Sequence, residues 1–516
     1  MRLPSLPNEI IDHVLGFVPR SDLAKLCQVN NSLRHSTEPF LYSTIFLYWY
    51  HDEIPPIIPL LRTLLERSEL FVYIDSVTLC GIDFGAGVTR PLLDTTTMPL
   101  DQFQAAIKQT QVPYTSLWID QLRSGSIDAL AGLLIANLSK TVFLAITHNF
   151  IHECEVVPRV LQSKILGQLP EFTTFGRLPK FERLSHLVYC KRRDDPFEEY
   201  DDDEYFIEAI SLLCLPTVTD LVIRLPNPEV FYWPFGEPDL DHLTSLEVDW
   251  VYPRCLAKIL TCTRNLRTLS WIWQYREDAT IGSDSILDYD RIITALLPLK
   301  GTLETLRFQL DEEVLQAAGP GIATVGSWNG LRDFQRLTHL EVPLMSLTGV
   351  GPDPQPMERY IPDRLETLCL VPTMLTQKDA VLWMCHPEAV SNQEFKNMSR
   401  DESRPEHCIL AVIHAFTRQC TLSLPRLHCI GFAGDYYLWN IELDFLMDQL
   451  GVKHGSIEFQ VIDEPYWEAH HLPGYLDCIE SNLVGHALPF GEGKGGRVDE
   501  MRDAAIKAHG GSCGSA

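Results

Sequence analysis

Apolar residues near the N-terminus recur three or four positions apart, which is the spacing of a helix with one apolar face. The recurring residues are Ile10, Ile11, Val14, Leu15 and Val18. Pro7 suits the first turn because its missing N–H would have no helical partner there, and Pro19 ends the helix. The pattern therefore predicts a helix over residues 6–18.

Two more short helices are predicted after Pro19. The second can be capped by Ser21 or Asp22 and the third by Asn30 or Asn31, since these side chains accept hydrogen bonds from a first turn. We expect the third helix to end before Pro39, because a proline disfavours helical backbone in the residue before it. Three helices of this size cannot bury all of their apolar surface alone. Part of that surface must therefore meet the next domain or a partner.

The period of the pattern changes from about residue 70. A six-residue unit recurs there: an apolar residue, two variable residues, an apolar residue, one variable residue and a final apolar residue. Its copies begin at Ile74, Leu184, Val218, Leu243, Leu266, Leu303, Leu337, Leu365 and Leu427. The last two apolar residues are two apart, so they share one face of a short strand. Helix-compatible runs, such as residues 206–213 and 290–297, lie between the copies.

This unit resembles the strand portion of a leucine-rich repeat. Strand, helix and strand with parallel pairing give a curved solenoid in which each unit needs its neighbours. The copies are unevenly spaced, which predicts an irregular array with insertions, since regular repeats run about 20–29 residues. A conventional α/β domain with similar strands is the alternative.

The order of residues at the N-terminus resembles the F-box motif. Residues 6–11 read Leu-Pro-Asn-Glu-Ile-Ile, close to the signature Leu-Pro-x-Glu-[Ile/Leu]-[Ile/Leu]. Residues 26–34 are similar to the family's Leu-x-x-Val-Ser-Lys-x-Trp-Arg, and residues 39–45 resemble the Leu-Tyr-containing close of many fungal members. The chain departs from the pattern at Leu33, where Trp is common, and at Asn30, where Ser or Cys is common.

The resemblance implies docking onto a Skp-type adaptor, which in turn joins a cullin scaffold and a RING subunit. F-box helices lay an apolar surface against the adaptor's helices, a form of helix-face recognition. The candidate adaptor contacts are Leu6, Pro7, Ile10, Ile11, Val14, Leu15, Leu23 and Leu26. The sequence leaves open which of them face the adaptor and which hold the three helices together.

The predicted fold class is α/β: a short N-terminal three-helix F-box, then an irregular leucine-rich-repeat solenoid with parallel strands on the concave face and helices outside. The F-box is expected at residues 1–48 and the repeat domain at residues 70–465. An acidic insertion at about 191–205 is expected to be a loop, because like charges this dense stay solvated, and a polar insertion is expected at about 386–408. The Gly-rich tail, residues 466–516, is expected to be partly disordered.

The variable strand residues of the repeats are expected to line the concave face. They carry mixed charges, which suggests a protein or peptide target: Arg224, Glu247, Asp249, Ile272, Arg307, Gln309 and Glu341. Aromatic residues crowd into the same three units. Trp271 occupies a core position of its unit. Trp250 and Trp273 lie an even number of residues from core positions of their strands, so they should point to the same face, and we expect them to be buried. If the strands end early, Trp250 and Trp273 would instead lie on a rim and anchor a partner.

Charge, apolar stretches and motifs argue against several classes of function. The net charge of −27 repels phosphate backbones, so we expect no nucleic-acid partner. No apolar stretch has the length of a membrane span, and the N-terminus has no secretory signal, so we expect no membrane association and a location in the cytoplasm, the nucleus or both. The His and Cys residues between 407 and 429 fit no familiar zinc spacing, and no catalytic motif is present, so we expect no metal, no cofactor and no enzymatic activity.

These observations predict a substrate-recognition subunit of an SCF-type E3 ubiquitin ligase, whose F-box binds the adaptor and whose repeats bind a protein target. Two alternatives remain. One is an F-box scaffold that works outside a ligase. The other is an enzyme whose helical cap only resembles an F-box.

Overall fold

The computed structural model describes the chain in segments. These are residues 7–50, 54–82, 92–148, 150, 154–166, 178–190, 202–225, 230–234, 236–249, 251–273, 286–310, 323–343, 346–347, 359–371, 424–433 and 458–462. The polar insertion at about 386–408 and the tail at residues 466–516 lie outside the described residues.

Three helices form the N-terminal module: α1 (Asn8–Leu15), α2 (Arg20–Val29) and α3 (Asn31–Ser43). The first is shorter than predicted. Pro7 precedes it, and beyond Leu15 the amide of Phe17 bonds to the carbonyl of Val14 at 3.1 Å in a tighter turn. Asn30 caps α3 as predicted, because its side chain accepts a hydrogen bond from the amide of Leu33 at 2.9 Å.

Two local predictions in this module are wrong. Neither Ser21 nor Asp22 caps α2, since Pro19 is the residue that precedes the helix and no side chain bonds to its first amides. The third helix does not end before Pro39 but contains it. Packing on both sides of the proline keeps the helix intact: Glu38 is 5% exposed, and Phe40 packs on the module's own core.

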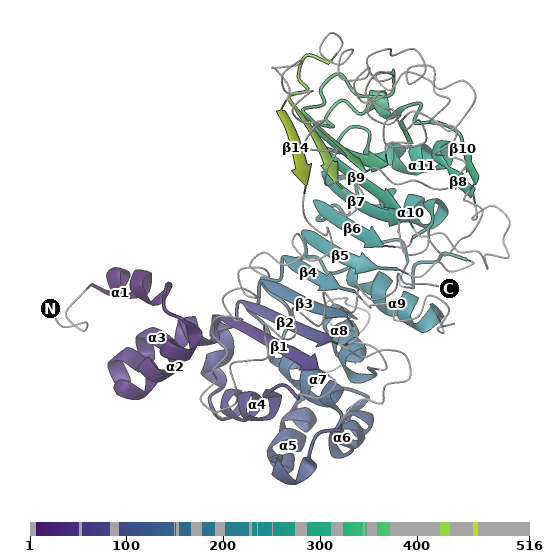
Figure 1. Cartoon of the computed structure of the whole chain (residues 1–516). Coiled ribbons are helices and arrows are strands. Elements are labelled where there is room, and N and C mark those ends of the chain that lie inside the picture. The colour runs from purple at the N-terminus through teal and green to yellow at the C-terminus, as the bar shows by residue number, and fades with distance from the viewer. Residues whose placement is uncertain are drawn as a thin grey trace, which may run out of the picture.

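A large parallel sheet makes up the rest of the described structure (Figure 1). Its strands lie side by side in the order β1 (Thr44–Tyr50), β2 (Ser76–Ile82), β3 (Phe143–His148), β4 (His186–Tyr189), β5 (Asp220–Arg224), β6 (Ser245–Asp249), β7 (Thr268–Trp273), β9 (Thr305–Leu310), β11 (His339–Pro343), β12 (Thr367–Val371), β13 (Cys429–Ala433) and β14 (Glu458–Ile462). Every two neighbours in this order pair in parallel. A separate two-stranded sheet pairs β8 (Ile286–Asp288) with β10 (Ala323–Val325).

The recurring six-residue unit predicted nine of these twelve described strands, all except β1, β3 and β14. Every copy ends on a strand of the large sheet, beginning with the copy at Ile74 on β2. The prediction of a mixed α/β fold with N-terminal helices and a parallel sheet is confirmed. The sheet starts earlier than residue 70, however, because β1 at residues 44–50 directly follows α3 and pairs with β2. The unit also missed β3, where Thr141 stands at the first apolar position and its hydroxyl instead donates to the carbonyl of Ile74 at 2.9 Å.

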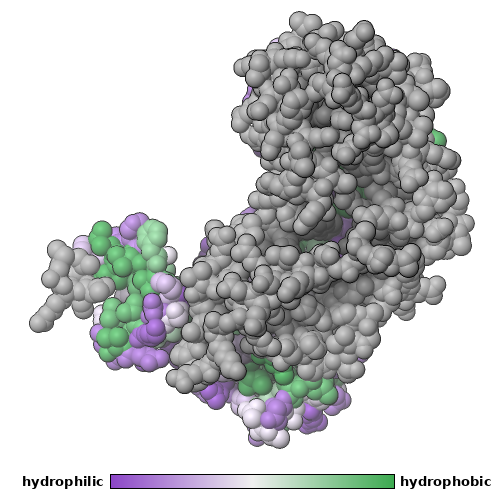
Figure 2. Space-filling model, in the orientation of Figure 1, coloured by the Kyte–Doolittle hydropathy of each residue, from purple (hydrophilic) through white to green (hydrophobic). Residues whose placement is uncertain are grey.

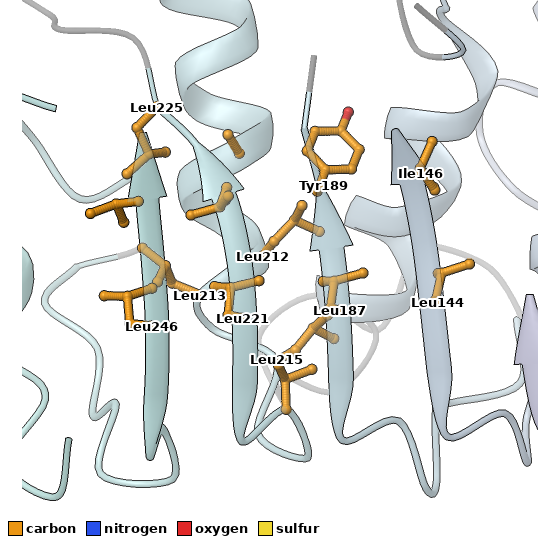
Figure 3. Packing of buried hydrophobic residues seen from close by; sticks show 14 of the residues in the cluster. Leu144, Ile146, Leu187, Tyr189, Leu212, Leu213, Leu215, Leu221, Leu225 and Leu246 are labelled. Carbon is orange, nitrogen blue, oxygen red and sulfur yellow. The ribbon is translucent and has the colours of Figure 1, made fainter. Parts of the chain in front are cut away.

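The apolar positions of the unit form continuous rows across the sheet. In the register of the strands, the first row consists of Ile45, Val77, Leu144, Leu187, Leu221, Leu246, Leu269, Leu306, Leu340, Leu368 and Ile430. All of these side chains are at most 2% exposed. Figure 3 shows Leu144, Leu187, Leu221 and Leu246 of this row on neighbouring strands. A unit therefore buries its apolar residues mainly against the units on either side of it.

Helices connect the strands and lie along one side of the sheet (Figure 1). They are α4 (Ile57–Glu66), α5 (Leu100–Thr110), α6 (Thr115–Arg123), α7 (Ile127–Asn137), α8 (Val156–Leu166), α9 (Asp202–Leu212), α10 (Pro253–Leu260) and α11 (Tyr289–Leu296), with short 3-10 turns η2 (Ser68–Tyr73), η3 (Thr95–Thr97), η5 (Leu297–Leu299) and η6 (Leu331–Asp333). The two helix-compatible runs read from the sequence correspond to α9 and α11. One core of buried side chains extends from β1 to β13 between sheet and helices.

The end of the acidic insertion is helical, where a loop was expected. Helix α9 begins at Asp202, so the last part of the insertion at about 191–205 is helical, and residues 191–201 lie outside the described structure. The correction has a physical reason, since acidic residues are favoured in the first turn of a helix by its dipole. Charge density alone did not predict this.

The two tryptophans of β7 are buried. Trp271 is fully buried, and its indole Nε1 donates to the carbonyl of Val251 at 2.9 Å. Trp273 is 2% exposed, so the expectation of a buried side chain is confirmed and the alternative of a rim anchor is wrong for this residue. Trp250 lies outside the described residues.

Candidate functional sites

Helix α1 has a buried face that forms the core of the N-terminal module. Ile11 is 6% exposed and Leu15 is 1% exposed, and both pack with Leu23 of α2, which is 5% exposed. Val18, Leu26, Phe40 and Leu41 are partly buried against this cluster. These side chains hold the three helices together.

The opposite face of α1 presents apolar side chains to solvent. Ile10 is 48% exposed, Val14 is 42% exposed and Phe17 is 78% exposed. They lie four and three residues apart, so they follow one stripe along the helix and the turn after it. Pro7, at the start of the helix, is also exposed. We call Pro7, Ile10, Val14 and Phe17 the α1 stripe.

Figure 2 shows hydrophobic residues gathered on the surface of the N-terminal module, as the exposure of the α1 stripe requires. Phe17 packs its ring edge-to-face with His13, with ring centroids 5.1 Å apart. Val29, at the end of α2, is a further exposed apolar residue at 64%. Exposed apolar side chains that follow one another along a helix, as in the α1 stripe, make this face a candidate binding surface.

The structure divides the eight adaptor contacts that the sequence suggested. Pro7, Ile10 and Val14 are exposed, whereas Ile11, Leu15 and Leu23 are buried in the module. Leu26 is half-buried, and Leu6 lies outside the described residues. Phe17 and Val29 are exposed apolar residues that were not among the contacts suggested by the sequence. The signal for Phe17 was present, because it continues the helical spacing of Ile10 and Val14.

An ion pair joins the N-terminal module to the body. Glu38 of α3 accepts two hydrogen bonds from the guanidinium of Arg67, which lies just before η2, with Nη1–Oε1 and Nη2–Oε2 distances of 2.5 and 2.9 Å. Arg67 also donates to Glu69 through Nε at 2.9 Å. The hydrogen bond from Arg67 holds the pKa of the buried Glu38 carboxyl below its usual range. A bidentate pair fixes direction as well as distance, so α3 is held in one orientation on the body.

The second candidate site consists of the seven strand residues expected on the concave face. The structure brings them together on the face of the sheet that alternates with the core rows, because the register aligns Arg224 with Asp249, Ile272 with Gln309, and Arg307 with Glu341. Side-chain contacts link several of them. Arg224 Nη2 lies 3.4 Å from Asp249 Oδ2, Arg307 Nε lies 4.0 Å from Glu341 Oε2, and the Gln309 amide donates to Glu341.

Burial separates these seven residues into two groups. Glu247, Asp249, Ile272 and Glu341 are 8%, 1%, 3% and 5% exposed, which corrects the expectation that they line an accessible surface. Buried charges need partners, and the contacts to Arg224, Arg307 and Gln309 supply them for Asp249 and Glu341. Asp249 and Glu341 therefore link neighbouring strands through their side chains, while Arg224, Arg307 and Gln309 remain partly accessible.

The environment of this charged group also acts on a cysteine. Burial and the nearby Asp249 carboxylate raise the pKa of the Cys190 thiol, which follows β4. A thiol with a raised pKa stays protonated at neutral pH and is a poor nucleophile.

The described residues hold no group of three or more His, Cys, Asp or Glu side chains placed to bind a metal ion. Of the His and Cys residues between 407 and 429, only His428 and Cys429 fall within the described part of the chain. Among the helices that the structure describes, none combines the length and the apolar character needed to cross a bilayer.

The N-terminal helices belong to a known class of module. Residues 3–38 match the family model of the F-box domain. The match spans α1, α2 and the start of α3, and it ends at Glu38, the residue that pairs with Arg67 of the body. The match supports the interpretation of the chain as an F-box protein. F-box domains generally bind Skp-type adaptors, and their presence suggests a role in substrate recognition by SCF-type ubiquitin ligases. No curated protein matches the chain.

Proposed function

We propose that this chain is a substrate receptor of an SCF-type E3 ubiquitin ligase. The observation that carries the proposal is the α1 stripe, which exposes Pro7, Ile10, Val14 and Phe17 on a domain that matches the F-box family. The partner of the stripe is a Skp-type adaptor, and through the adaptor the chain joins a cullin and a RING subunit. Leu6, a further contact suggested by the sequence, directly precedes Pro7 in the chain.

Energetics favour the stripe over the buried residues as the docking surface. Full burial of a Val, Ile or Phe side chain stabilises a complex by about 1.5–3 kcal/mol per residue. Phe17 and Ile10 have the most to gain, because 78% and 48% of their surface is exposed in the free chain. Ile11, Leu15 and Leu23 are already buried in the module's core. They therefore position the stripe without contacting the adaptor.

The body is proposed to be a leucine-rich-repeat solenoid that binds a protein target. Its support is the recurring unit, the sequential parallel sheet and the rows of buried leucines. In this function the chain makes and breaks no covalent bond. It raises the effective concentration of the target near the ubiquitin-charged enzyme. The Glu38–Arg67 pair supports this role, since a receptor must hold the target at a defined position relative to the adaptor.

Co-purification of the full chain with a Skp-type adaptor tests the docking step. Ile10→Asp and Phe17→Asp each place a charge in the proposed interface without entering the core, so we expect each to weaken adaptor binding by at least about tenfold, equivalent to about 1.4 kcal/mol. Ser32→Asp adds the same charge at an exposed polar position of α3 and should leave binding unchanged. A natural chain that does not bind the adaptor contradicts the proposal, as do stripe variants that bind equally well.

Reconstitution with cullin and RING subunits separates the receptor from a scaffold that works outside a ligase. A receptor is expected to bring the cullin into the complex through the adaptor. Adaptor binding without cullin recruitment would favour the scaffold instead.

A further inference from the structure

The turns that precede strands β11, β12 and β13 have the same backbone structure. In each turn a leucine amide bonds to the carbonyl three residues earlier at 3.1 Å, and the three leucines are Leu337, Leu365 and Leu427. The strands that follow are neighbours in the sheet and pair in parallel. The residues directly before these leucines therefore occupy equivalent places in three successive units of the body.

An arginine stands at this place in all three units. The residues are Arg336, Arg364 and Arg426, and each of them is exposed. We call these three residues the arginine strip. Neighbouring strands lie about 4.7–4.9 Å apart, so the three turns follow one another at about this spacing along one edge of the sheet. The two preceding units have Asn265 and Thr302 at the same position, so the strip begins with the unit of β11.

The members of the strip differ in their partners. Arg336 Nη2 lies 3.0 Å from Glu304 Oε1 of the preceding unit, so its charge is compensated. Arg364 and Arg426 form no ion pair or side-chain hydrogen bond with any residue that the structure describes. These two guanidinium groups keep all of their N–H donors available to a ligand.

Two acidic residues belong to the same turns. Asp363 is bound by Arg332 at 2.9 Å, so its charge is already compensated. Glu366 lies two residues beyond Arg364 and is half-buried, and among the described residues it has no ion-pair partner. Its carboxylate weakens the attraction of the strip for an anion. It does not cancel that attraction, because the unpaired arginines outnumber it.

Three arginines at equivalent places do not stabilise the free chain. Like charges on neighbouring strands repel one another, so the strip lowers the stability of the body in the absence of an anion. The body is held together by its rows of buried leucines and does not need these side chains for cohesion. A carboxylate offsets the repulsion and binds a guanidinium through two parallel N–H···O hydrogen bonds.

We propose that the arginine strip binds a short acidic segment of the target, with carboxylates on Arg364 and Arg426. An extended peptide advances about 3.3 Å per residue, so a run of a few acidic residues reaches from one of these turns to the next. The net charge of −27 repels a long polyanion such as a nucleic acid. A short acidic peptide is attracted by the strip alone, since distant charges are screened beyond about 8 Å at physiological salt. This inference rests on the proposed receptor function and names the chemistry of its target.

Fluorescence polarisation with labelled probes tests the strip on the full chain. The probes are Gly-Glu-Glu-Glu-Glu-Gly, its isosteric control Gly-Gln-Gln-Gln-Gln-Gly and a single-stranded thymidine oligonucleotide of the same charge as the acidic peptide. We expect the acidic peptide to bind about tenfold more tightly than the control, because it alone forms charge-assisted hydrogen bonds. Equal binding of the two peptides overturns the proposal, as does tighter binding of the oligonucleotide.

Matched variants locate the binding. Arg364→Gln combined with Arg426→Gln should lower the affinity for the acidic peptide by about tenfold or more, equivalent to about 1.4 kcal/mol. Lys108→Gln combined with Lys258→Gln removes the same charge from exposed positions on α5 and α10 and should change little. Glu366→Gln should strengthen binding a few fold, because it removes the acid beside the strip. An arginine double variant that melts like the natural chain and binds as the lysine double variant does contradicts the proposal, as does a Glu366→Gln chain that binds more weakly.

Adaptor binding measured on the same preparations keeps the two proposals apart. A chain that binds the adaptor but prefers neither peptide overturns the acidic-segment site and leaves the receptor function standing. A chain that binds the acidic peptide but no adaptor overturns the receptor function, and the strip is then a peptide site outside a ligase.

Discussion

The N-terminal module and the body use apolar side chains in opposite ways. The module has a core of a few residues, led by Leu15 at 1% exposed, and it leaves Phe17 78% exposed on the outside. The body buries its recurring apolar residues almost completely, and one core extends over its described strands from β1 to β13. A small helical module with surplus apolar surface needs a partner to bury that surface. A stack of repeating units buries its apolar surface between neighbouring units.

The junction between the two regions combines an ion pair with apolar packing. Glu38 and Arg67 form a bidentate pair there, Thr37 is fully buried, and Tyr42 of α3 packs against the body's core. The ion pair fixes orientation more than it adds stability. The module can therefore depend on its partner for stability while keeping a defined direction relative to the body.

The same substitution in the two cores gives the largest predicted effects. Leu246→Ala in the body is expected to lower the free energy of unfolding by about 2–5 kcal/mol, because it leaves a cavity in a fully buried row. Leu15→Ala in the module should have a cost of the same order, confined to the helices. Urea unfolding followed by tryptophan fluorescence reports the body, and hydrogen exchange of residues 8–43 reports the module.

Adding the adaptor sharpens this contrast. It should recover much of the protection that Leu15→Ala loses, since a partner that binds only the folded module stabilises it by mass action. It should not recover the loss in Leu246→Ala. A Leu15→Ala chain whose body unfolds earlier than the natural one would show that the two regions are not separate in stability.

The junction should give an intermediate effect. Glu38→Gln removes the charge that Arg67 binds, and we expect it to loosen α3 on the body by about 1–3 kcal/mol. This is less than for a fully buried pair, because the Arg67 side chain is 36% exposed. Hydrogen exchange of residues 31–43 measures the change. Glu69→Gln, which removes the other carboxylate on the same arginine, serves as the control and should have a smaller effect.

The junction also predicts a pH dependence. The pKa of Glu38 is lowered in the folded chain, so its contribution is fully present above the ordinary glutamate pKa of 4.5 and is lost as the pH falls through the folded value below it. Protection of α3 should therefore fall on acidification below pH 4.5 in the natural chain more steeply than in Glu38→Gln. Parallel acid profiles for the two chains would rule out this role of Glu38.

Ion pairs on the surface of the body should give the smallest effect. Arg332 Nη2 lies 2.9 Å from Asp363 Oδ1, but the two side chains are 57% and 65% exposed. A double-mutant cycle with Arg332→Gln and Asp363→Asn is expected to give a coupling of about 0.2–1 kcal/mol that fades at high salt. A larger, salt-independent coupling would mean that surface pairs between units stabilise the body as much as its leucine rows do.

Sequence reasoning succeeded where a periodic pattern had one physical meaning. The spacing of Ile10, Val14 and Leu15 predicted a helix, and the recurring unit predicted the strands, because core positions in helices and strands repeat with fixed periods. It failed where local rules compete with packing. Pro39 lies inside α3, and the acidic insertion continues into α9. It also could not tell that Asp249 and Glu341 are buried, since alternation along a strand assigns a face but not what covers that face.

By itself the sequence determined an F-box-like N-terminus, a body of parallel strands and an acidic chain, because motif order, period and charge are properties of the residues alone. Only the tertiary structure decided which apolar residues of α1 face solvent and which strand charges are paired. These features depend on residues far apart in the chain, whose contacts no local pattern records. The α1 stripe shows both sources together: spacing predicted an apolar helix, and the packing of Ile11 and Leu15 against Leu23 left Ile10, Val14 and Phe17 on the outside.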